Sequence, residues 1–297
     1  MRRPVKRLVI GALLLPTVIR GADTSKGKAT YELRCAPCHG PEGRGDGPVA
    51  SGLSPPPRPI KRSTTSSPIS SHSGRPSIDA RLVVMAKHPA PGQVKTRLVP
   101  ALGPDRACAL YAAFVQDLAA RLQALPYEVT WAYWPPESPF PALLPGARCR
   151  PQRGADLGER MTGAIADAFS EGPTPVMVIG ADAPHLPADS IAEAATVLGG
   201  EADLVLGPAA DGGYYLVGLC RPQPELFSDI PWSTAGVLAA TGERAARLGL
   251  RQHLLAPCFD VDGPEDLALL DAMLARGEVQ LPHTARLLAT PGRAFPT

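Results

Sequence analysis

The stretch VMVIGADAPHLP, residues Val176–Pro187, joins a short apolar run to an acidic turn that contains two prolines. A short apolar run between turn signals predicts a strand that is buried on both faces, as strands of parallel sheets are. Asp182 follows this strand and falls at its carboxyl end, where ligands bind in parallel α/β sheets. There its carboxylate can hold a divalent cation against phosphate oxygens, and the alternative is that it caps a turn.

Apolar runs of this kind alternate with helical periodicities on both sides of the stretch. Further strands are predicted at Arg81–Ala86, Tyr127–Trp134, Leu204–Leu206 and Tyr214–Val217. Helices are predicted at or near Leu110–Leu122, Leu157–Phe169, Ile191–Leu198 and Ala235–Leu248, and Asp156 with Glu159 is the expected capping box of the second. Strands separated by helices predict a Rossmann-like, three-layer α/β/α domain around a mainly parallel sheet.

The composition is that of a globular protein, with 44% hydrophobic and 20% charged residues over a length of 297. A net charge of +2 excludes the broad cationic field that nucleic-acid binding needs, so no nucleic acid is expected as a partner. Aromatic residues make up 5% of the chain, which disfavours a surface for stacking sugars or bases. The six cysteines form no small-domain disulfide framework, because only the first two are closely spaced.

These first two cysteines belong to a CxxCH motif. Cys35 and Cys38 would bind the vinyl groups of a covalent haem c, and His39 would be an axial ligand. The surrounding residues, from 26 to about 59, resemble the opening helix and haem loop of class I cytochromes c. Such a cytochrome needs further helices and a distal methionine, but the first methionine after residue 1 is Met85. The segment is therefore expected to be a truncated module that cannot enclose a haem by itself.

Composition also marks the ends of the predicted α/β domain. A basic start and an apolar run from Leu8 to Ile19, too short to span a bilayer, are typical of a secretory signal. The alternative is an N-terminal extension or a misplaced start codon. Hydroxyl residues dominate between Lys61 and Ser77, as is typical of a linker. The predicted parts are a signal-like segment (1–22), the truncated cytochrome c-like segment (23–60), a Ser-rich linker (61–78), the α/β domain (79–280) and a C-terminal tail (281–297).

The loop that follows the first predicted strand, Ala86–Leu98, reads AKHPAPGQVKTRL. It contains neither GxxxxGK nor GxGxxG, so the P-loop and dinucleotide-binding fingerprints are absent from it. Lys95 and Arg97 lie past the strand end on a loop shaped by glycine and proline, where two cations can neutralise a diphosphate. The alternative is a solvated basic loop.

Two acidic motifs follow later in the chain. Asp211 opens DGGYYL, whose two glycines allow close backbone approach, and the alternative is a hairpin turn. FDVDGPEDL places Asp260 and Asp262 in a DxD spacing, which in extended backbone directs both side chains the same way. Asp266 is expected to cap the closing helix or to face solvent. Together the motifs predict a metal and nucleotide-diphosphate site at one edge of the sheet.

Six motifs occur in order between Val83 and Leu270: MAKHPAPGQVKTRL, PQRGADLGERM, VIGADAPHLP, DLVLGPAADGGYYLVGL, IPWSTAGVLAAT and DVDGPEDL. In these motifs the chain resembles the rSAM/selenodomain-associated transferase 1 family, also labelled arsenosugar-biosynthesis-type glycosyltransferases. That family belongs to the nucleotide-diphospho-sugar transferase (GT-A) superfamily, so the resemblance implies a GT-A-like three-layer fold. Phospholactate and molybdenum-cofactor guanylyltransferases are similar more distantly.

The resemblance also implies a set of charged site residues. Asp182 and Asp262 would hold Mg²⁺ or Mn²⁺, while Lys95 and Arg97 would contact the phosphates and take part in catalysis. One departure is Gly263, where the family usually has threonine, and this is expected to loosen the turn that presents Asp262.

The nucleotide and the acceptor are assigned to other segments. The resemblance implies that the nucleotide is bordered by Gln152, Gly154, Asp156 and Arg160. Asp211 would accept a proton from the acceptor hydroxyl, and Gly212 and Gly213 would line the acceptor side.

The predicted function is metal-dependent glycosyl transfer from a nucleotide-activated sugar to an unknown small-molecule acceptor. The alternative on the same fold is guanylyltransferase-like nucleotidyl transfer to a phosphorylated small molecule, for which the sequence shows no second basic cluster. A second alternative is an exported c-type haem electron-transfer protein. A transferase would work in the cytoplasm, where activated nucleotides are kept. A functional signal and haem motif would instead place the chain in the periplasm, with only transient contact to the membrane.

Overall fold

The computed structural model describes residues 80–290, which lie in the second of two compact units of the chain, Gly74–Thr297. The signal-like segment, the cytochrome c-like segment with its CxxCH motif and the linker lie outside the described residues. Within residues 80–290, no helix is both long and apolar enough to cross a membrane.

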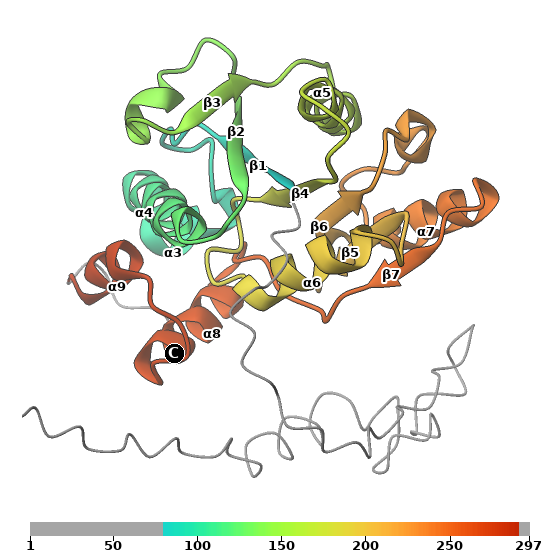
Figure 1. The fold of residues 1–297 in the computed structure, drawn as a ribbon. Coiled ribbons are helices and arrows are strands. Elements are labelled where there is room, and N and C mark those ends of the chain that lie inside the picture. Colours follow the sequence, from blue (N-terminus) through green and yellow to red (C-terminus); the bar gives the residue numbers. More distant parts are fainter. Residues whose placement is uncertain (1–79, 291–297) are drawn as a thin grey trace, which may run out of the picture. The chain divides into compact units, whose positions relative to one another are not determined.

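One sheet of seven strands forms the centre of the described unit (Figure 1). Its spatial order is β3-β2-β1-β4-β6-β5-β7. The strands are β1 (Arg81–Lys87), β2 (Glu128–Trp134), β3 (Arg148–Pro151), β4 (Val176–Gly180), β5 (Leu204–Pro208), β6 (Tyr214–Leu219) and β7 (Gln252–Leu254). All neighbouring pairs are parallel except those that involve β6, which runs antiparallel to β4 and β5. The prediction of a mainly parallel sheet is confirmed.

Helices cover both faces of this sheet. The α-helices are α3 (Val99–Leu102), α4 (Pro104–Gln123), α5 (Leu157–Phe169), α6 (Ala188–Leu198), α7 (Val237–Arg247), α8 (Pro264–Ala275) and α9 (Pro282–Ala289). Three short 3₁₀ turns are η2 (Thr96–Leu98), η3 (Phe140–Leu143) and η4 (Pro224–Phe227). Buried side chains of α4, α6 and α8 share one apolar cluster, whereas those of α5, η4 and α7 share the other. The three-layer α/β/α prediction is therefore confirmed.

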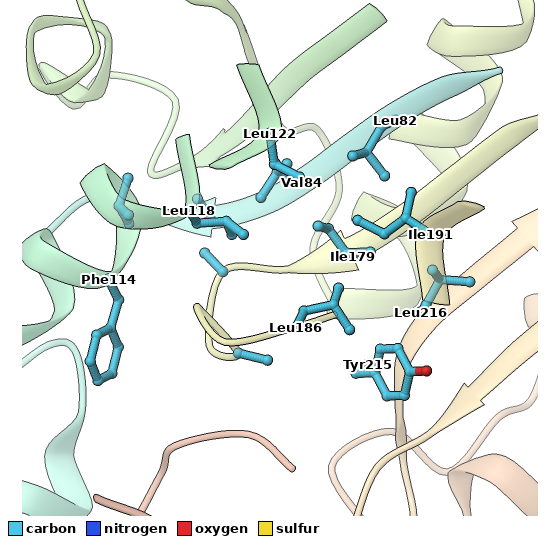
Figure 2. Packing of buried hydrophobic residues seen from close by; sticks show 14 of the residues in the cluster. Leu82, Val84, Phe114, Leu118, Leu122, Ile179, Leu186, Ile191, Tyr215 and Leu216 are labelled. Atoms are coloured by element: carbon cyan, nitrogen blue, oxygen red, sulfur yellow. The ribbon is translucent and has the colours of Figure 1, made fainter. Parts of the chain in front are cut away.

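Strand alternation produces the two clusters. In β1, Leu82 and Val84 face α4, while Val83 between them packs on the α5 side. Figure 2 shows the first cluster, in which Leu118 of α4 and Ile191 of α6 lie over the sheet. Burial of such side chains is the main favourable term in folding, about 1.5–3 kcal/mol for each Leu, Ile or Val.

The expected C-terminal tail from residue 281 is wrong in its first part, because α9 belongs to the folded unit. Leu281 is buried in the first cluster. Asp117, which is fully buried on α4, accepts hydrogen bonds from the backbone N–H groups of His283 and Thr284 at 2.9 and 2.8 Å. These two donors stand in the first turn of α9 and would otherwise lack partners. A carboxylate from a distant helix therefore caps α9, which short-range sequence signals do not reveal.

The predicted caps of two other helices are present. Asp156 accepts a hydrogen bond from the Glu159 N–H at 2.8 Å at the start of α5, while the Glu159 carboxylate reaches back to Ala155 N–H rather than to Asp156. Asp266 accepts from the N–H groups of Asp262 and Gly263 at 3.0 and 2.7 Å at the start of α8. Asp266 thereby secures the turn that the Gly263 departure was expected to loosen.

Candidate active site

Loops from the carboxyl edge of the parallel strands enclose a cleft of about 720 Å³. Because β6 runs antiparallel, its first residue, Tyr214, lies at the same edge as the last residues of β1, β2 and β4. The five residues before it form the β5–β6 hairpin, so DGG is a hairpin turn and also borders the cleft. Of the predicted site residues, those that line the cleft are Lys95, Arg97, Gln152, Arg160, Asp182, Asp211, Gly213 and Asp262.

Two carboxylates from distant parts of the chain meet at one ammonium group. Lys95 Nζ donates to Asp182 Oδ1 and, at 3.1 Å, to Asp262 Oδ1. Arg97 Nη1 lies 3.7 Å from the other oxygen of Asp262. The backbone N–H of Val261 donates to the carbonyl of Asp182 at 3.0 Å, which ties the two acidic loops together. The expectation that Asp182 and Asp262 share one edge of the sheet is confirmed.

The ammonium is buried beneath the two carboxylates. The Lys95 side chain is 2% exposed, whereas those of Asp182 and Asp262 are 44% and 39% exposed toward solvent. Burial by itself would lower the pKa of Lys95, but the charges of Asp182 and Asp262 outweigh it and raise that pKa. Lys95 therefore stays charged and offsets part of the negative charge of the pair, and its contact with phosphates remains a prediction. Arg97, whose side chain is 74% exposed, is free to reach a ligand in the cleft.

A third carboxylate, Asp260, lines the same cleft. Burial raises its pKa to about 7, and repulsion by Asp182 and Asp262 adds to that shift, while Lys95 opposes it. Val261 between the two DxD acids is fully buried, so Asp260 and Asp262 are directed to the same side, as predicted. The sequence motif FDVDGPEDL gave Asp260 no specific role. Its burial beside Asp182 and Asp262 is what distinguishes it in the structure.

The carboxylate oxygens of Asp182 and Asp262 fit a divalent cation that also binds a substrate. Carboxylate oxygens suit Mg²⁺ and Mn²⁺, and Mg²⁺ usually takes one or two carboxylates together with substrate phosphates. Within residues 80–290, no group of three or more His, Cys, Asp or Glu side chains is spaced as a metal site. Asp182 and Asp262 therefore fit a cation only in company with phosphate oxygens, and metal binding stays a prediction.

The segment expected to border the nucleotide divides into two kinds of residue. Gln152 and Arg160 line the cleft, and the Gln152 amide donates to the carbonyl of Ala132 at 2.7 Å, which ties it to the end of β2. Gly154 and Asp156 do not line the cleft. Gly154 has φ of +133° and leaves no room for a Cβ, which would stand 2.6 Å from that of Glu159, and Asp156 caps α5.

The acceptor-side residues are placed by a close backbone contact. Gly212 has φ of +87°, and a Cβ there would lie 2.2 Å from the carbonyl oxygen of Ala235. Gly212 therefore lets the hairpin turn rest on the segment before α7, although it does not line the cleft itself. Asp211 is exposed at the cleft and accepts from Gly213 N–H at 2.9 Å.

Aromatic side chains of the cleft were missed by the sequence reasoning. Trp134 ends β2, and the guanidinium of Arg160 lies 4.7 Å from the centre of its ring. Trp232 lies in the IPWSTAG motif and meets Tyr214 edge-on, with ring centres 6.4 Å apart. The local signal from which Trp232 could have been found is a tryptophan in a turn beside small residues.

Comparison with known proteins identifies the described unit. A family described as an uncharacterized protein conserved in bacteria (DUF2064) matches residues 116–234. A solved structure of a candidate nucleotide-diphospho-sugar transferase from Desulfovibrio desulfuricans G20 is 35% identical, covers 70% of this chain and 93% of its own, and superposes with a TM-score of 0.63. The chain belongs to this nucleotide-diphospho-sugar transferase family. No curated protein matches it.

Two other solved structures resemble the transferase unit more weakly. A CMP:2-keto-3-deoxy-manno-octonic acid synthetase complexed with CTP is 14% identical, with a TM-score of 0.42 over 67% of this chain and 99% of its own. A 4-diphosphocytidyl-2C-methyl-D-erythritol synthase is 15% identical, with a TM-score of 0.44 over 66% of this chain and 98% of its own. Neither bears on the site.

The cytochrome c family matches residues 24–112, which include the CxxCH motif. The last part of this match, from residue 80 onward, runs from β1 through η2 and α3 into the start of α4 of the transferase unit. The cytochrome-like match thus supports the haem motif, but the described part of it is folded as part of the α/β layers.

Proposed function

We propose that the unit transfers a glycosyl group from a nucleotide-activated sugar to a hydroxyl group of a small acceptor, with the help of Mg²⁺ or Mn²⁺. The observation that carries this proposal is the meeting of Asp182 and Asp262 at Lys95, beside the exposed Arg97, in the cleft at the carboxyl edge of the sheet. Within the family, the six ordered motifs favour the rSAM/selenodomain-associated transferase 1 group.

The transfer exchanges one C–O bond for another. The acceptor oxygen bonds to the anomeric carbon, and the bond from that carbon to the nucleoside diphosphate breaks, leaving its electron pair on the diphosphate oxygen. Arg97 stabilises the charge that develops there, and a bound divalent cation at Asp182 and Asp262 would supply further positive charge. Lys95 keeps those two carboxylates together. The hydroxyl proton passes to a carboxylate of the acceptor side, for which we propose Asp211.

Donor binding is tested by thermal unfolding of the full-length chain with UDP, GDP, CDP and ADP sugars, each with and without Mn²⁺. A ligand at a hundred times its Kd stabilises the folded state by about 2.7 kcal/mol, which is a rise of several degrees in Tm. We expect one nucleotide class to give this rise only with Mn²⁺, and Asp182→Asn to abolish it. Asp189→Asn is the matched control, since Asp189 is exposed at the start of the next helix. A rise that Asp182→Asn leaves intact would refute the assigned site.

Nucleotidyl transfer to a phosphorylated small molecule is the rival on this fold. In that reaction a phosphate oxygen attacks the α-phosphate of a nucleoside triphosphate, and pyrophosphate leaves. Release of nucleoside diphosphate from a sugar nucleotide supports glycosyl transfer, whereas release of pyrophosphate from a triphosphate supports the rival.

Electron transfer by the N-terminal segment is a separate proposal that the cytochrome c match favours. It assigns covalent haem c to Cys35, Cys38 and His39 and would place the chain in the periplasm, whereas the transferase reaction alone would place it in the cytoplasm.

A further inference from the structure

The walls of the cleft differ in charge. The cations that line it within residues 80–290 are Lys87, Lys95, Arg97 and Arg160, and all of them come from the end of β1, the loop after it, or α5. The other wall, from the β5–β6 hairpin, the segment before α7 and the DxD segment, contributes no Lys, Arg or His to the lining. Its ionisable groups there are the carboxyl groups of Asp211, Asp260 and Asp262, and Asp262 borders the cationic wall, where it pairs with Lys95 and Arg97.

This division assigns the two substrates of the proposed reaction to different walls. A nucleoside diphosphate is an anion and fits the cationic wall. A phosphorylated acceptor on the other wall would meet carboxyl groups of like charge, and the cations nearest to that wall, Lys95 and Arg97, already pair with Asp262. The approach of like charges costs free energy at short range. Hydroxyl groups, in contrast, donate hydrogen bonds to carboxylates.

The segment before α7 also carries an aromatic ring, that of Trp232, which rests against α5 where the two walls meet. The ring is partly exposed in the cleft and is held by neighbours on several sides. Tyr214 meets it edge-on and Phe227 lies beside it, each with ring centres 6.4 Å away. Its indole Nε1 lies so close to Gly158 of α5 that a Cβ on that glycine would stand 2.3 Å from it.

A ring clamped in this way loses little conformational entropy when a ligand stacks on it. Its apolar face suits the C–H face of a cyclic polyol, whose hydroxyl groups can then reach the carboxylates at the rim. The low aromatic content of the whole chain disfavoured a stacking surface, yet two of its three tryptophans line this cleft.

We propose that the acceptor is an uncharged, hydroxyl-rich ring compound of the sugar class, which stacks on Trp232 and turns its hydroxyl groups toward Asp211 and Asp260. The proposal rests on the glycosyl-transfer function and selects the class of acceptor for it. Trp232 is then the residue that determines specificity, and an anionic acceptor is excluded by the charge of its wall.

The test is saturation-transfer NMR on the full-length chain with two sets of probes. One set is neutral, the methyl glycosides of glucose, galactose, mannose and ribose, and the other is anionic, the 1-phosphates of the same sugars. We expect at least one neutral glycoside to bind and the phosphates to bind more weakly. Trp232→Ala should weaken the neutral glycoside at least fivefold.

Gly158→Ala provides a second variant that does not remove the ring. Alanine is a better helix former than glycine, so α5 is retained. The new Cβ displaces Trp232, so this variant, like Trp232→Ala, should weaken glycoside binding. Gly163→Ala in the same helix is the matched control, because its nearest contact would be 3.4 Å from Arg153 O. It should leave glycoside binding unchanged.

The proposal is overturned if no neutral glycoside binds at 10 mM, if a sugar phosphate binds more tightly than its neutral partner, or if Trp232→Ala binds as the wild type does. Nucleotide binding with Mn²⁺, measured on the same samples, distinguishes a failure of the proposed function from a failure of the acceptor inference. If the wild type binds no nucleotide, the proposed function is refuted. If it binds a nucleotide but prefers anionic acceptors, only the acceptor inference is refuted.

Discussion

Replacing Asp260 by asparagine should stabilise the protein, and the gain should depend on pH. The pKa of Asp260 is raised from 3.8 to about 7 in the folded protein by burial and by the neighbouring acids. Between these two values the unfolded chain releases the proton and the folded chain keeps it. The contribution of Asp260 to the stability of the wild type is therefore most favourable below about pH 4, falls as the pH rises toward 7, and is level above that.

The magnitude follows from the shift. Each pH unit between the two pKa values lowers the free energy of unfolding by about 1.4 kcal/mol. Of the range from pH 5 to pH 8, only about two units lie below the folded-state pKa. The free energy of unfolding of the wild type should therefore fall by on the order of 3 kcal/mol over this range, whereas that of Asp260→Asn should not. Any lost hydrogen bond of the variant is common to both pH values and cancels in the difference.

The assay is urea unfolding of both proteins at pH 5, 6.5 and 8 in buffer with EDTA, followed by circular dichroism. Asp271→Asn, an exposed position on α8, is the control and should show no such divergence. Added Mn²⁺ should narrow the gap at pH 8, because a cation at Asp182 and Asp262 offsets the repulsion. A stability difference between wild type and Asp260→Asn that is constant from pH 5 to pH 8 would refute the reasoning.

Three further predictions concern the rest of the chain. Asp117→Ala should destabilise the protein by about 2–3 kcal/mol, since the buried N–H of Thr284 and the part-buried N–H of His283 in α9 lose their acceptor, and limited proteolysis should then cut near residue 281; resistance equal to the wild type would contradict it. Gly212→Ala should cost at least about 2 kcal/mol in urea unfolding, because its positive φ and the contact with Ala235 O both oppose a Cβ; an unchanged midpoint would contradict the close approach. Expression with c-type maturation machinery should give a covalent haem band on denaturing gels that Cys35→Ser removes; a wild type without the band would contradict the haem proposal.

Much of the fold could be predicted from local patterns. The apolar runs at Arg81 and Val176 mark buried strands, and the four-residue spacing from Leu110 onward marks the face of α4. The edge strands β3 and β7 could not be predicted from the sequence. They are only four and three residues long, their side chains are not buried, and they show no apolar alternation. Their pairing depends on the neighbouring strand rather than on their own residues.

The sequence by itself determined the buried strands and the amphipathic helices, and that acidic and basic residues follow the strands, because apolar periodicity and turn chemistry act over a few residues. Parallel topology then brings Asp182 and Asp262 to one edge, as the pattern predicted. Only the tertiary structure decided that Lys95 lies beneath these carboxylates, with its backbone in a left-handed conformation at φ 47°, and that Trp232 rests against Gly158. Burial, charge neutralisation and ring stacking join residues far apart in the chain, and no short-range signal encodes which of them will meet.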